Sequence, residues 1–259
     1  MTRRRFYAPP VAFGPDEKSA KLGAEETRHA RDVLRLHSGD EIYVFDGTGR
    51  EFLCGVQSIR RDSAELNVIA KVAPTRPESP LNLTLAIVLL KGEKFDLVIQ
   101  KVTELGVKHI VPLGSERADM RLRDSEDANN RVARWRRIAR ESAKQSGRAC
   151  VPEVAAPLTF NSLLMMYAVE EKKSQTNVTR LMFSERDGRS LSEATNSFAG
   201  QPAEIIALVG PEGGWTDEEI ELAREGGWEI VTLGGRTLRA ETAGITVVTL
   251  LQHRFGDLV

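Results

Sequence analysis

The chain has 259 residues, of which 41% are hydrophobic and 28% are charged, as is typical of a globular protein with a buried core. Its length allows one large domain or two moderate ones. The two cysteines lie far apart and the four histidines are scattered, so neither a disulfide framework nor a metal site is expected. The longest apolar run, 85–90, is too short to cross a bilayer, and no signal-peptide pattern is present. We therefore expect a cytoplasmic protein without a membrane partner.

The distribution of charge is more informative than the net charge, which is −1. Between Arg131 and Arg148, seven basic residues accompany the single acid Glu141. A basic block inside an otherwise acidic chain favours a local site for an anionic partner. The alternative is a solvated helix face that binds nothing.

A proline-rich linker at 73–82 divides the chain into a domain at 1–72 and a domain at 83–259. Before the linker, short apolar runs at close intervals predict a small β-barrel. The predicted elements in chain order are a helix at 25–36 and strands at 41–45, 51–59 and 64–72, with a hairpin-type turn at Asp46-Gly47.

After the linker, the continuous apolar run at 83–90 suits a buried parallel strand, and an amphipathic helix closed by Gly106 follows it. Strand and helix patterns then alternate, which predicts an open, mostly parallel α/β sheet. Further strands are predicted at 109–113, 180–184, 204–209 and 229–233, further helices at 131–145, 216–224 and 242–255, and surface loops at 116–130 and 170–177.

Two glycine-rich segments follow predicted strands of this sheet, at the strand ends where open α/β sheets bind ligands. The first, 209–215, exposes its backbone to close approach and leads into a capping-box helix start. The second, 233–243, contains a glycine pair and then Arg236 and Arg239 with Leu238 between them. Neither segment matches a dinucleotide fingerprint or a phosphate-binding loop. The alternatives are a plain strand-to-helix turn for the first segment and a charged loop with a helix cap for the second.

Together these residues resemble the SPOUT methyltransferases, and specifically the RsmE family, which methylates N3 of a uridine in small-subunit ribosomal RNA. The resemblance covers nearly the whole chain, and the two glycine-rich segments are its most specific parts. It is also carried by shorter motifs, namely His29 with Val33-Leu34-Arg35-Leu36, Gly39-Asp40, Phe45-Asp46-Gly47, Lys91-Gly92-Glu93-Lys94, Gln100-Lys101, Thr103-Glu104-Leu105-Gly106-Val107, Ser115-Glu116-Arg117, Arg134-Trp135, Ile138-Ala139, Glu141, Lys144 to Arg148 and Val151-Pro152.

The resemblance implies an α/β fold, namely a trefoil-knotted, mostly parallel SPOUT sheet behind a small PUA-like β-barrel. It implies S-adenosylmethionine as cofactor, 16S ribosomal RNA of the small ribosomal subunit as partner, and a homodimer whose active site uses residues of both subunits. It assigns three loops to the cofactor, at 183–185, 209–214 and 233–239. Within them, the residues expected to bind the cofactor are Phe183, Ser184, Val209, Gly210, Glu212, Gly213, Gly214, Leu233, Gly234, Leu238 and Arg239.

Uridine N3 carries a proton, so its methylation requires removal of that proton and stabilisation of the resulting anion. A fixed arginine beside the flanking carbonyl oxygens would favour the anion. Arg148 and Arg239 are the catalytic candidates, with Glu212 as proton acceptor or orienter, or alternatively as a structural carboxylate that caps its turn. The expected RNA ligands are Arg3, Arg4, Arg5, Lys91, Lys94, Arg134, Arg137, Lys144, Arg148 and Arg236.

Two other functions remain open at this point. Another SPOUT reaction, on a transfer-RNA guanine or a ribose 2′-hydroxyl, would use the same fold, although the run 238–242 and the preceding barrel argue against it. A non-catalytic ribosome-assembly factor would bind RNA without turnover, although the loop glycines needed for close approach to a cofactor are all present. An NAD-dependent enzyme is disfavoured because its glycine fingerprint is missing.

Overall fold

The structure is a computed structural model that describes residues 3–114, 125–173, 178–196, 198, 200–202 and 204–258. These residues form two compact units. The amino-terminal unit comprises Met1–Glu78 with Arg140–Val151, and the α/β unit comprises Ser79–Ala139 with Pro152–Val259. The boundary between the units, after Glu78, falls inside the predicted linker 73–82. Residues 140–151, which the sequence-based division places in the α/β domain, group with the amino-terminal unit.

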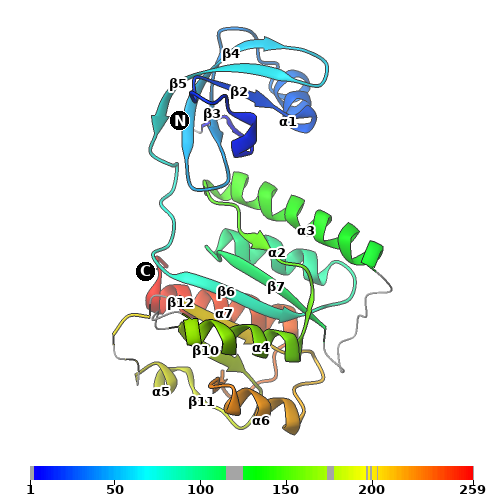
Figure 1. The fold of residues 1–259 in the computed structure, drawn as a ribbon, viewed down its shortest axis with the longest axis vertical. Helices are drawn as coiled ribbons and strands as arrows, with labels where there is room; N and C mark the ends of the chain where they lie inside the picture. The colour runs from blue at the N-terminus through cyan, green and yellow to red at the C-terminus, as the bar shows by residue number, and fades with distance from the viewer. Residues whose placement is uncertain are drawn as a thin grey trace. The chain divides into compact units, whose positions relative to one another are not determined.

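The amino-terminal unit is built on a curled five-stranded sheet (Figure 1). Its elements are β1 (Arg5–Tyr7), the 3-10 turn η1 (Pro10–Ala12), β2 (Ser19–Leu22), α1 (Ala24–Arg28), the π-helical turn η2 (His29–Val33), β3 (Glu41–Phe45), β4 (Glu51–Ile59) and β5 (Ala64–Val72). The strand order is β1-β3-β4-β5-β2, and only β1 and β3 pair in parallel. Alternate side chains such as Ile42, Val44 and Leu66 point into its core.

The three strands predicted in this unit are confirmed, but the predicted helix 25–36 is only partly right. The α-helix ends at Arg28, a single π-helical turn follows, and Arg35 adopts a left-handed backbone conformation with φ of 50°. The helical spacing of apolar residues is misleading here because Ala30 is buried whereas Val33 is 67% exposed. The periodicity therefore does not describe a buried helix face.

Arg5 accounts for the grouping of residues 140–151 with the amino-terminal unit. Its guanidinium donates two hydrogen bonds of 3.2 Å to the fully buried carboxylate of Glu51. It also donates to the backbone carbonyls of Lys144 at 2.8 Å and Arg148 at 2.9 Å. One buried arginine thus connects β1, β4 and the segment that ends α3 (Ser125–Ser146). Charge-assisted, bidentate bonds of this kind are among the strong polar contacts in proteins.

Replacing Arg5 with methionine is expected to lower the free energy of unfolding by about 3 kcal/mol, because the buried Glu51 would lose its buried charge partner and keep only the more exposed Arg3, at 3.3 Å. Chemical denaturation of both proteins measures this difference. The matched control is Arg4→Met, since Arg4 is exposed and its side chain has no hydrogen-bond or ion-pair partner among the described residues, although its backbone carbonyl accepts a hydrogen bond from Tyr43. A loss below about 1 kcal/mol for Arg5→Met would contradict the role given to this ion pair.

The same ion pair makes the stability pH-dependent. Burial by itself would raise the pKa of Glu51, but the hydrogen bonds from Arg5 and from the backbone N–H of Thr75 outweigh it and lower the pKa. A carboxyl with a lowered folded-state pKa stabilises the fold above its unfolded value of about 4.3, and this contribution is lost as the pH falls through the folded value. The stability difference between wild type and Arg5→Met should therefore shrink below about pH 4.

The α/β unit contains an eight-stranded sheet with helices on both faces. Its elements, besides the first part of α3, are β6 (Asn82–Val88), α2 (Lys94–Glu104), β7 (His109–Gly114), β8 (Glu153–Val154), β9 (Leu158–Thr159), α4 (Phe160–Lys173), β10 (Val178–Phe183), β11 (Arg189–Ser190), α5 (Leu191–Asn196), β12 (Glu204–Val209), α6 (Asp217–Glu225), β13 (Glu229–Thr232) and α7 (Ala240–Phe255). The strand order is β11-β13-β10-β12-β6-β7-β8, with β9 paired to β7, and these pairs are all parallel. This arrangement confirms the expected parallel α/β sheet.

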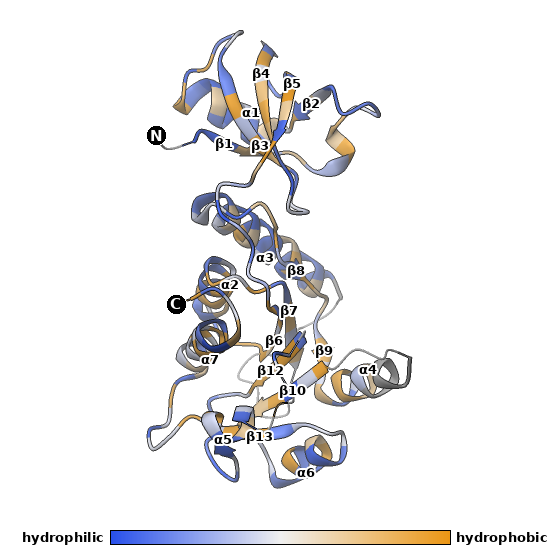
Figure 2. Ribbon diagram, turned by 90° about the vertical axis from the view of Figure 1, so that its left-hand side faces the viewer, coloured by the Kyte–Doolittle hydropathy of each residue, from blue (hydrophilic) through white to orange (hydrophobic). Residues whose placement is uncertain are grey.

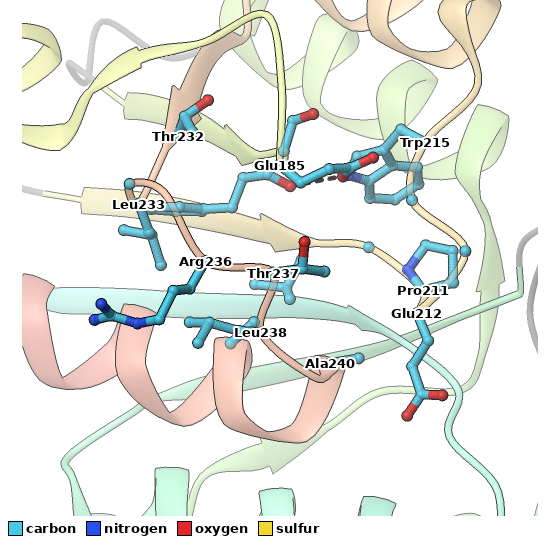
Figure 3. A pocket seen from close by; sticks show the side chains of 18 residues that line it. Glu185, Pro211, Glu212, Trp215, Thr232, Leu233, Arg236, Thr237, Leu238 and Ala240 are labelled. Atoms are coloured by element: carbon cyan, nitrogen blue, oxygen red, sulfur yellow. Dashed lines mark hydrogen bonds between the residues drawn. The ribbon is translucent and has the colours of Figure 1, made fainter.

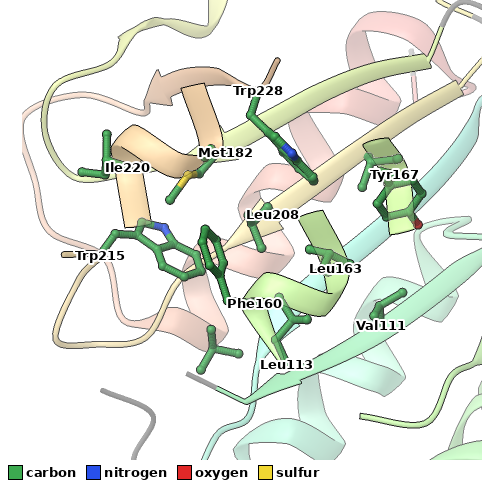
Figure 4. Close-up of a cluster of buried hydrophobic side chains, with 14 of the residues drawn as sticks. Val111, Leu113, Phe160, Leu163, Tyr167, Met182, Leu208, Trp215, Ile220 and Trp228 are labelled. Carbon is green, nitrogen blue, oxygen red and sulfur yellow. The ribbon is translucent and has the colours of Figure 1, made fainter. Parts of the chain in front are cut away.

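Helices α4 and α6 cover one face of this sheet, and α2 and α7 cover the other (Figure 2). On the first face, Phe160 of α4 and Ile220 of α6 pack with Leu208 of β12 in a buried apolar cluster (Figure 4). On the second face, α7 approaches β6 closely at Gly244, where an added Cβ would lie 2.7 Å from Cδ1 of Ile87. The absence of a side chain at Gly244 therefore lets α7 pack directly on the sheet.

Two sequence-based expectations in this unit need correction, and one helix is missing from the predicted elements. The predicted loop 116–130 is wrong for residues 125–130, which begin α3. Residues 116–124, and with them the motif Ser115-Glu116-Arg117, lie outside the described residues. The predicted loop 170–177 overlaps the end of α4. Helix α4 itself was not predicted, because its exposed methionines, including Met165 at 69% exposure, hide the apolar spacing of its buried side chains.

Candidate active site

The loops that follow β10, β12 and β13 enclose a cavity of about 320 Å³ in the α/β unit (Figure 3). These strands are neighbours, since β10 pairs with both β12 and β13. The volume lies within the range of about 300–1,000 Å³ that is typical of small-molecule sites. The lining residues are Phe183, Ser184, Glu185, Val209, Gly210, Pro211, Glu212, Gly213, Gly214, Trp215, Thr232, Leu233, Gly234, Arg236, Thr237, Leu238, Ala240 and Ala243.

Trp215 fixes the first glycine-rich loop. Its side chain is only 1% exposed, and its Nε1–H donates a hydrogen bond of 3.0 Å to the backbone carbonyl of Phe183. A Cβ on Gly210 would lie 2.7 Å from two atoms of the indole ring. At Gly214, where φ is 67°, a Cβ would clash with the carboxylate of Glu185. Two glycines of this loop are therefore required by the side chains that surround them.

The first loop ends in a firmly capped helix. The hydroxyl of Thr216 accepts a hydrogen bond of 3.0 Å from the backbone N–H of Glu219, and the carboxylate of Glu219 accepts one of 2.9 Å from the backbone N–H of Thr216. This reciprocal pair is the capping box expected from the sequence. Because α6 starts at a fixed point, the loop forms a wall of defined shape.

The second glycine-rich loop leaves its backbone open. Gly234 has φ of 112°, a conformation that side-chain-bearing residues rarely adopt, and a Cβ on Gly235 would meet no atom within 4 Å. Leu238 is half-buried at the cavity, and α7 begins at Ala240. Backbone polar groups of this loop are accordingly within reach of a ligand, beside an apolar side chain.

All the residues that the sequence assigns to the cofactor line this cavity except Arg239, which lies at the exposed N-cap of α7. Arg236, expected to contact RNA, lines the cavity instead. Glu185, Pro211 and Thr237 also line the cavity and lie within the loops that the sequence assigns to the cofactor. The lining residues outside those loops are adjacent to them in sequence, and this proximity is the signal that finds them: Trp215, Thr232, Ala240 and Ala243.

Glu212 lies at the cavity and forms an ion pair with a lysine. Its Oε1 is 2.5 Å from Nζ of Lys94. The hydrogen bond and the charge of Lys94 lower the pKa of Glu212, and the positive charges of Arg239 and Lys91 lower it further. The structure thus brings Glu212 and Arg239 within electrostatic reach of each other, with the carboxyl group ionised at neutral pH.

Arg148, the other catalytic candidate, belongs to the amino-terminal unit and does not line the cavity. It is 5% exposed, and its Nη2 donates a hydrogen bond of 2.7 Å to the carboxylate of Glu78. Glu78 also accepts the backbone N–H of Cys150 at 3.1 Å. Within this chain, Arg148 therefore has a structural partner.

Three of the basic residues expected to contact RNA, Arg5, Lys144 and Arg148, are largely covered. Their side chains are only 6%, 13% and 6% exposed, which favours a structural role over contact with a phosphate backbone. The physical reason is compensation by acids that are distant in sequence. Glu51 pairs with Arg5, Glu26 pairs with Lys144, and Glu78 pairs with Arg148.

Other expected RNA ligands remain at the surface. Arg137 is exposed, as is Lys91, and the exposed guanidinium of Arg134 pairs with Asp96. Exposed ion pairs of this kind contribute about 0–1 kcal/mol, so their cations remain available to a phosphate. Arg3 is half-buried and donates hydrogen bonds to Thr75 and to the backbone carbonyl of Ala73.

No described helix has both the length and the apolar character that a bilayer crossing requires. Within the described parts of the chain, no three His, Cys, Asp or Glu side chains come close enough together to hold a metal ion.

The sequence matches two family models. Residues 77–252 match an RNA methyltransferase domain, and residues 22–69 match an RNA methyltransferase PUA domain. The protein named Ribosomal RNA small subunit methyltransferase E in Synechocystis sp. is 38% identical over 227 residues, which cover 88% of this chain and 70% of the relative. The protein of the same name in Bacillus subtilis is 32% identical and covers 90% of this chain and 89% of its own length.

Solved structures agree with these matches. The crystal structure of a ribosomal RNA small subunit methyltransferase E from Neisseria gonorrhoeae, bound to S-adenosyl methionine, aligns with a TM-score of 0.83 at 33% identity and covers 100% of both chains. A putative methyltransferase from Legionella pneumophila, in complex with the same cofactor, aligns with a TM-score of 0.84 at 29% identity and also covers 100% of both chains. The chain therefore belongs to the RsmE family of SPOUT RNA methyltransferases.

Proposed function

We propose that this protein transfers a methyl group from S-adenosylmethionine to N3 of a uridine in 16S ribosomal RNA of the small ribosomal subunit, in the cytoplasm. The cavity between the two glycine-rich loops is the observation that carries the proposal. Relatives that align over 100% of this chain were crystallised with S-adenosylmethionine. The loops of this chain have the open backbone and the close packing that such a ligand needs.

The residues of the cavity fit this cofactor. Leu233 and Leu238 supply apolar surface for an adenine ring, and the open backbone at Gly234 supplies hydrogen-bonding groups for its edge. When bound, S-adenosylmethionine supplies a methyl group that its sulfonium centre has already activated. The main task left to the protein is to hold the base in line with that group, an effect that reaches about 7–11 kcal/mol in favourable cases.

Arg239 and Glu212 have the charges that the acceptor base requires. The exposed guanidinium of Arg239 would stabilise negative charge on the uridine carbonyl oxygens as N3 loses its proton. Glu212 is a weak base because Lys94 lowers its pKa, so complete proton removal by Glu212 is disfavoured. We therefore assign Glu212 to orienting the N3–H group through a hydrogen bond to its carboxylate, with the proton passing to solvent.

We also propose that the protein acts as a homodimer. Helices α2 and α7 pack together and leave Leu97 and Leu250 exposed on their outer surface. Apolar side chains in neighbouring helices form a surface that a second copy of the chain would cover. Analytical ultracentrifugation tests this proposal. The molar mass should be twice that of one chain, and Leu97→Lys should weaken the association of the dimer.

Nucleoside mass spectrometry of ribosomal RNA from cells with and without the protein tests the function. The expected product is 3-methyluridine in 16S ribosomal RNA, present only when the protein is present. Methylated guanosine in transfer RNA or a methylated ribose would instead identify another SPOUT reaction. RNA binding without heat on titration with S-adenosylmethionine would identify a non-catalytic assembly factor.

A further inference from the structure

Lys94 lies between two carboxylates that come from the two walls of the cavity. Its Nζ is 2.5 Å from Oε1 of Glu212, which belongs to the loop after β12. It is also 3.5 Å from Oε1 of Glu241, in the first turn of α7. Helix α2, which carries Lys94, contributes no residue to the lining. A lysine outside the cavity thus connects the segments that enclose it.

The largely buried carboxylate of Glu241 is compensated by the charge of Lys94. Its side chain is 13% exposed, and its Oε2 is buried without a hydrogen-bond partner among the described residues. A buried carboxylate with an unpaired oxygen is unfavourable unless an opposite charge lies close by. The start of α7 supplies part of that compensation through its helix dipole, and Lys94 supplies a full positive charge.

Both carboxylates that pair with Lys94 belong to segments that line the cavity. Glu212 lines it directly, and Ala240 and Ala243, on either side of Glu241, line it as well. Figure 3 shows the Glu212 side chain extending from the first loop away from Trp215. In this position its carboxylate pairs with Lys94 of α2. A shift of either carboxylate would therefore move a wall of the cavity.

We propose that Lys94 is a positioning residue that ties the first glycine-rich loop to the start of α7 and so sets the width of the cofactor cavity. This inference rests on the proposed function, because it takes the cavity to be the S-adenosylmethionine site. It gives Lys94 a different role from the RNA-phosphate contact expected from the sequence. The lysine acts on the cofactor through Glu212 and Glu241 and does not touch the reacting atoms.

Calorimetric titration with S-adenosylmethionine tests the proposal. Lys94→Met should raise the Kd about three- to tenfold, the range expected when a partly exposed ion-pair network is lost. Lys94→Arg should restore the affinity to within about twofold, because it keeps the positive charge. The double variant Lys94→Met with Glu241→Gln should bind no more weakly than Lys94→Met, because both changes remove the same tie.

The matched control is Lys101→Met. Lys101 lies on the same helix, has a similar exposure, and also pairs with a glutamate, Glu104, but it does not reach the cavity residues. Its replacement should leave the Kd for S-adenosylmethionine unchanged. Thermal unfolding of each variant shows whether the fold is retained, and Glu241→Gln alone gives a second test if Lys94→Met does not fold.

Salt dependence of RNA binding separates the two roles of Lys94. If Lys94 is a positioning residue, Lys94→Met should leave the slope of log RNA affinity against log salt concentration unchanged. A phosphate ligand would reduce that slope by about 0.7–0.9 and leave the Kd for S-adenosylmethionine unaltered, and this result would overturn the proposal. If wild-type protein fails to bind the cofactor, the proposed function fails. If wild type binds and Lys94→Met binds equally well, only the role of Lys94 fails.

Discussion

Replacing Gly210 with alanine is expected to abolish measurable binding of S-adenosylmethionine and methyl transfer while the sheet remains folded. The added Cβ would lie 2.7 Å from the indole of Trp215. This ring cannot give way, because it is buried, lies against the ring of Phe160 at a centroid distance of 5.3 Å, and is hydrogen-bonded to the carbonyl of Phe183. The loop must therefore move, and a displacement of about 1 Å in a reacting site can cost about a hundredfold in rate.

Calorimetry and a methylation assay measure the two effects of Gly210→Ala. The matched control is Gly235→Ala, because a Cβ at Gly235 meets no atom within 4 Å and the residue does not line the cavity. That variant should bind the cofactor as wild type does. Retention of cofactor affinity within about threefold in Gly210→Ala, equivalent to less than about 1 kcal/mol, would show that the loop tolerates the side chain and would contradict this account.

The cavity was largely predictable from the sequence because its residues lie in short segments directly after predicted strands. Parallel neighbouring strands bring their carboxyl ends to one edge of the sheet, so the loops at Gly210 and Gly234 had to come close together. The need for Gly210 itself could not be read in this way. It depends on the position of the Trp215 ring, which is set by packing against residues from another helix.

The roles of the charged residues were less predictable, because ion pairs join residues that are distant in sequence. The basic block 131–148 has few acids within it, yet Lys144 pairs with Glu26 and Arg148 pairs with Glu78. Local charge counts therefore overestimated the positive surface. The same limitation applies to Lys94, whose two carboxylate partners lie more than a hundred residues further along the chain.

Replacing Arg239 with alanine is expected to lower kcat by about 10²–10³-fold, the usual effect of removing one group that stabilises a developing oxyanion. The fold should be unaffected, because Arg239 is exposed and its side chain makes no capping hydrogen bond to α7. The Kd for S-adenosylmethionine should stay close to the wild-type value, since Arg239 does not line the cavity. Single-turnover methylation, calorimetry and thermal unfolding measure these three quantities. Wild-type kcat in Arg239→Ala would exclude the proposed role.

Arg148→Ala is the informative comparison, because the sequence analysis assigns both arginines the same role, whereas in the structure only Arg239 lies beside the cavity loops. Loss of the Arg148 guanidinium leaves Glu78 without its cation, at a cost of about 3 kcal/mol for a largely buried pair. Arg148→Ala should therefore unfold at lower denaturant concentration than wild type, whereas Arg239→Ala should not. If Arg148→Ala keeps its stability and loses methyl transfer, Arg148 acts on the base as the sequence predicts. If it loses stability and keeps kcat under conditions where it is folded, its function is to hold the segment 140–151 in the amino-terminal unit.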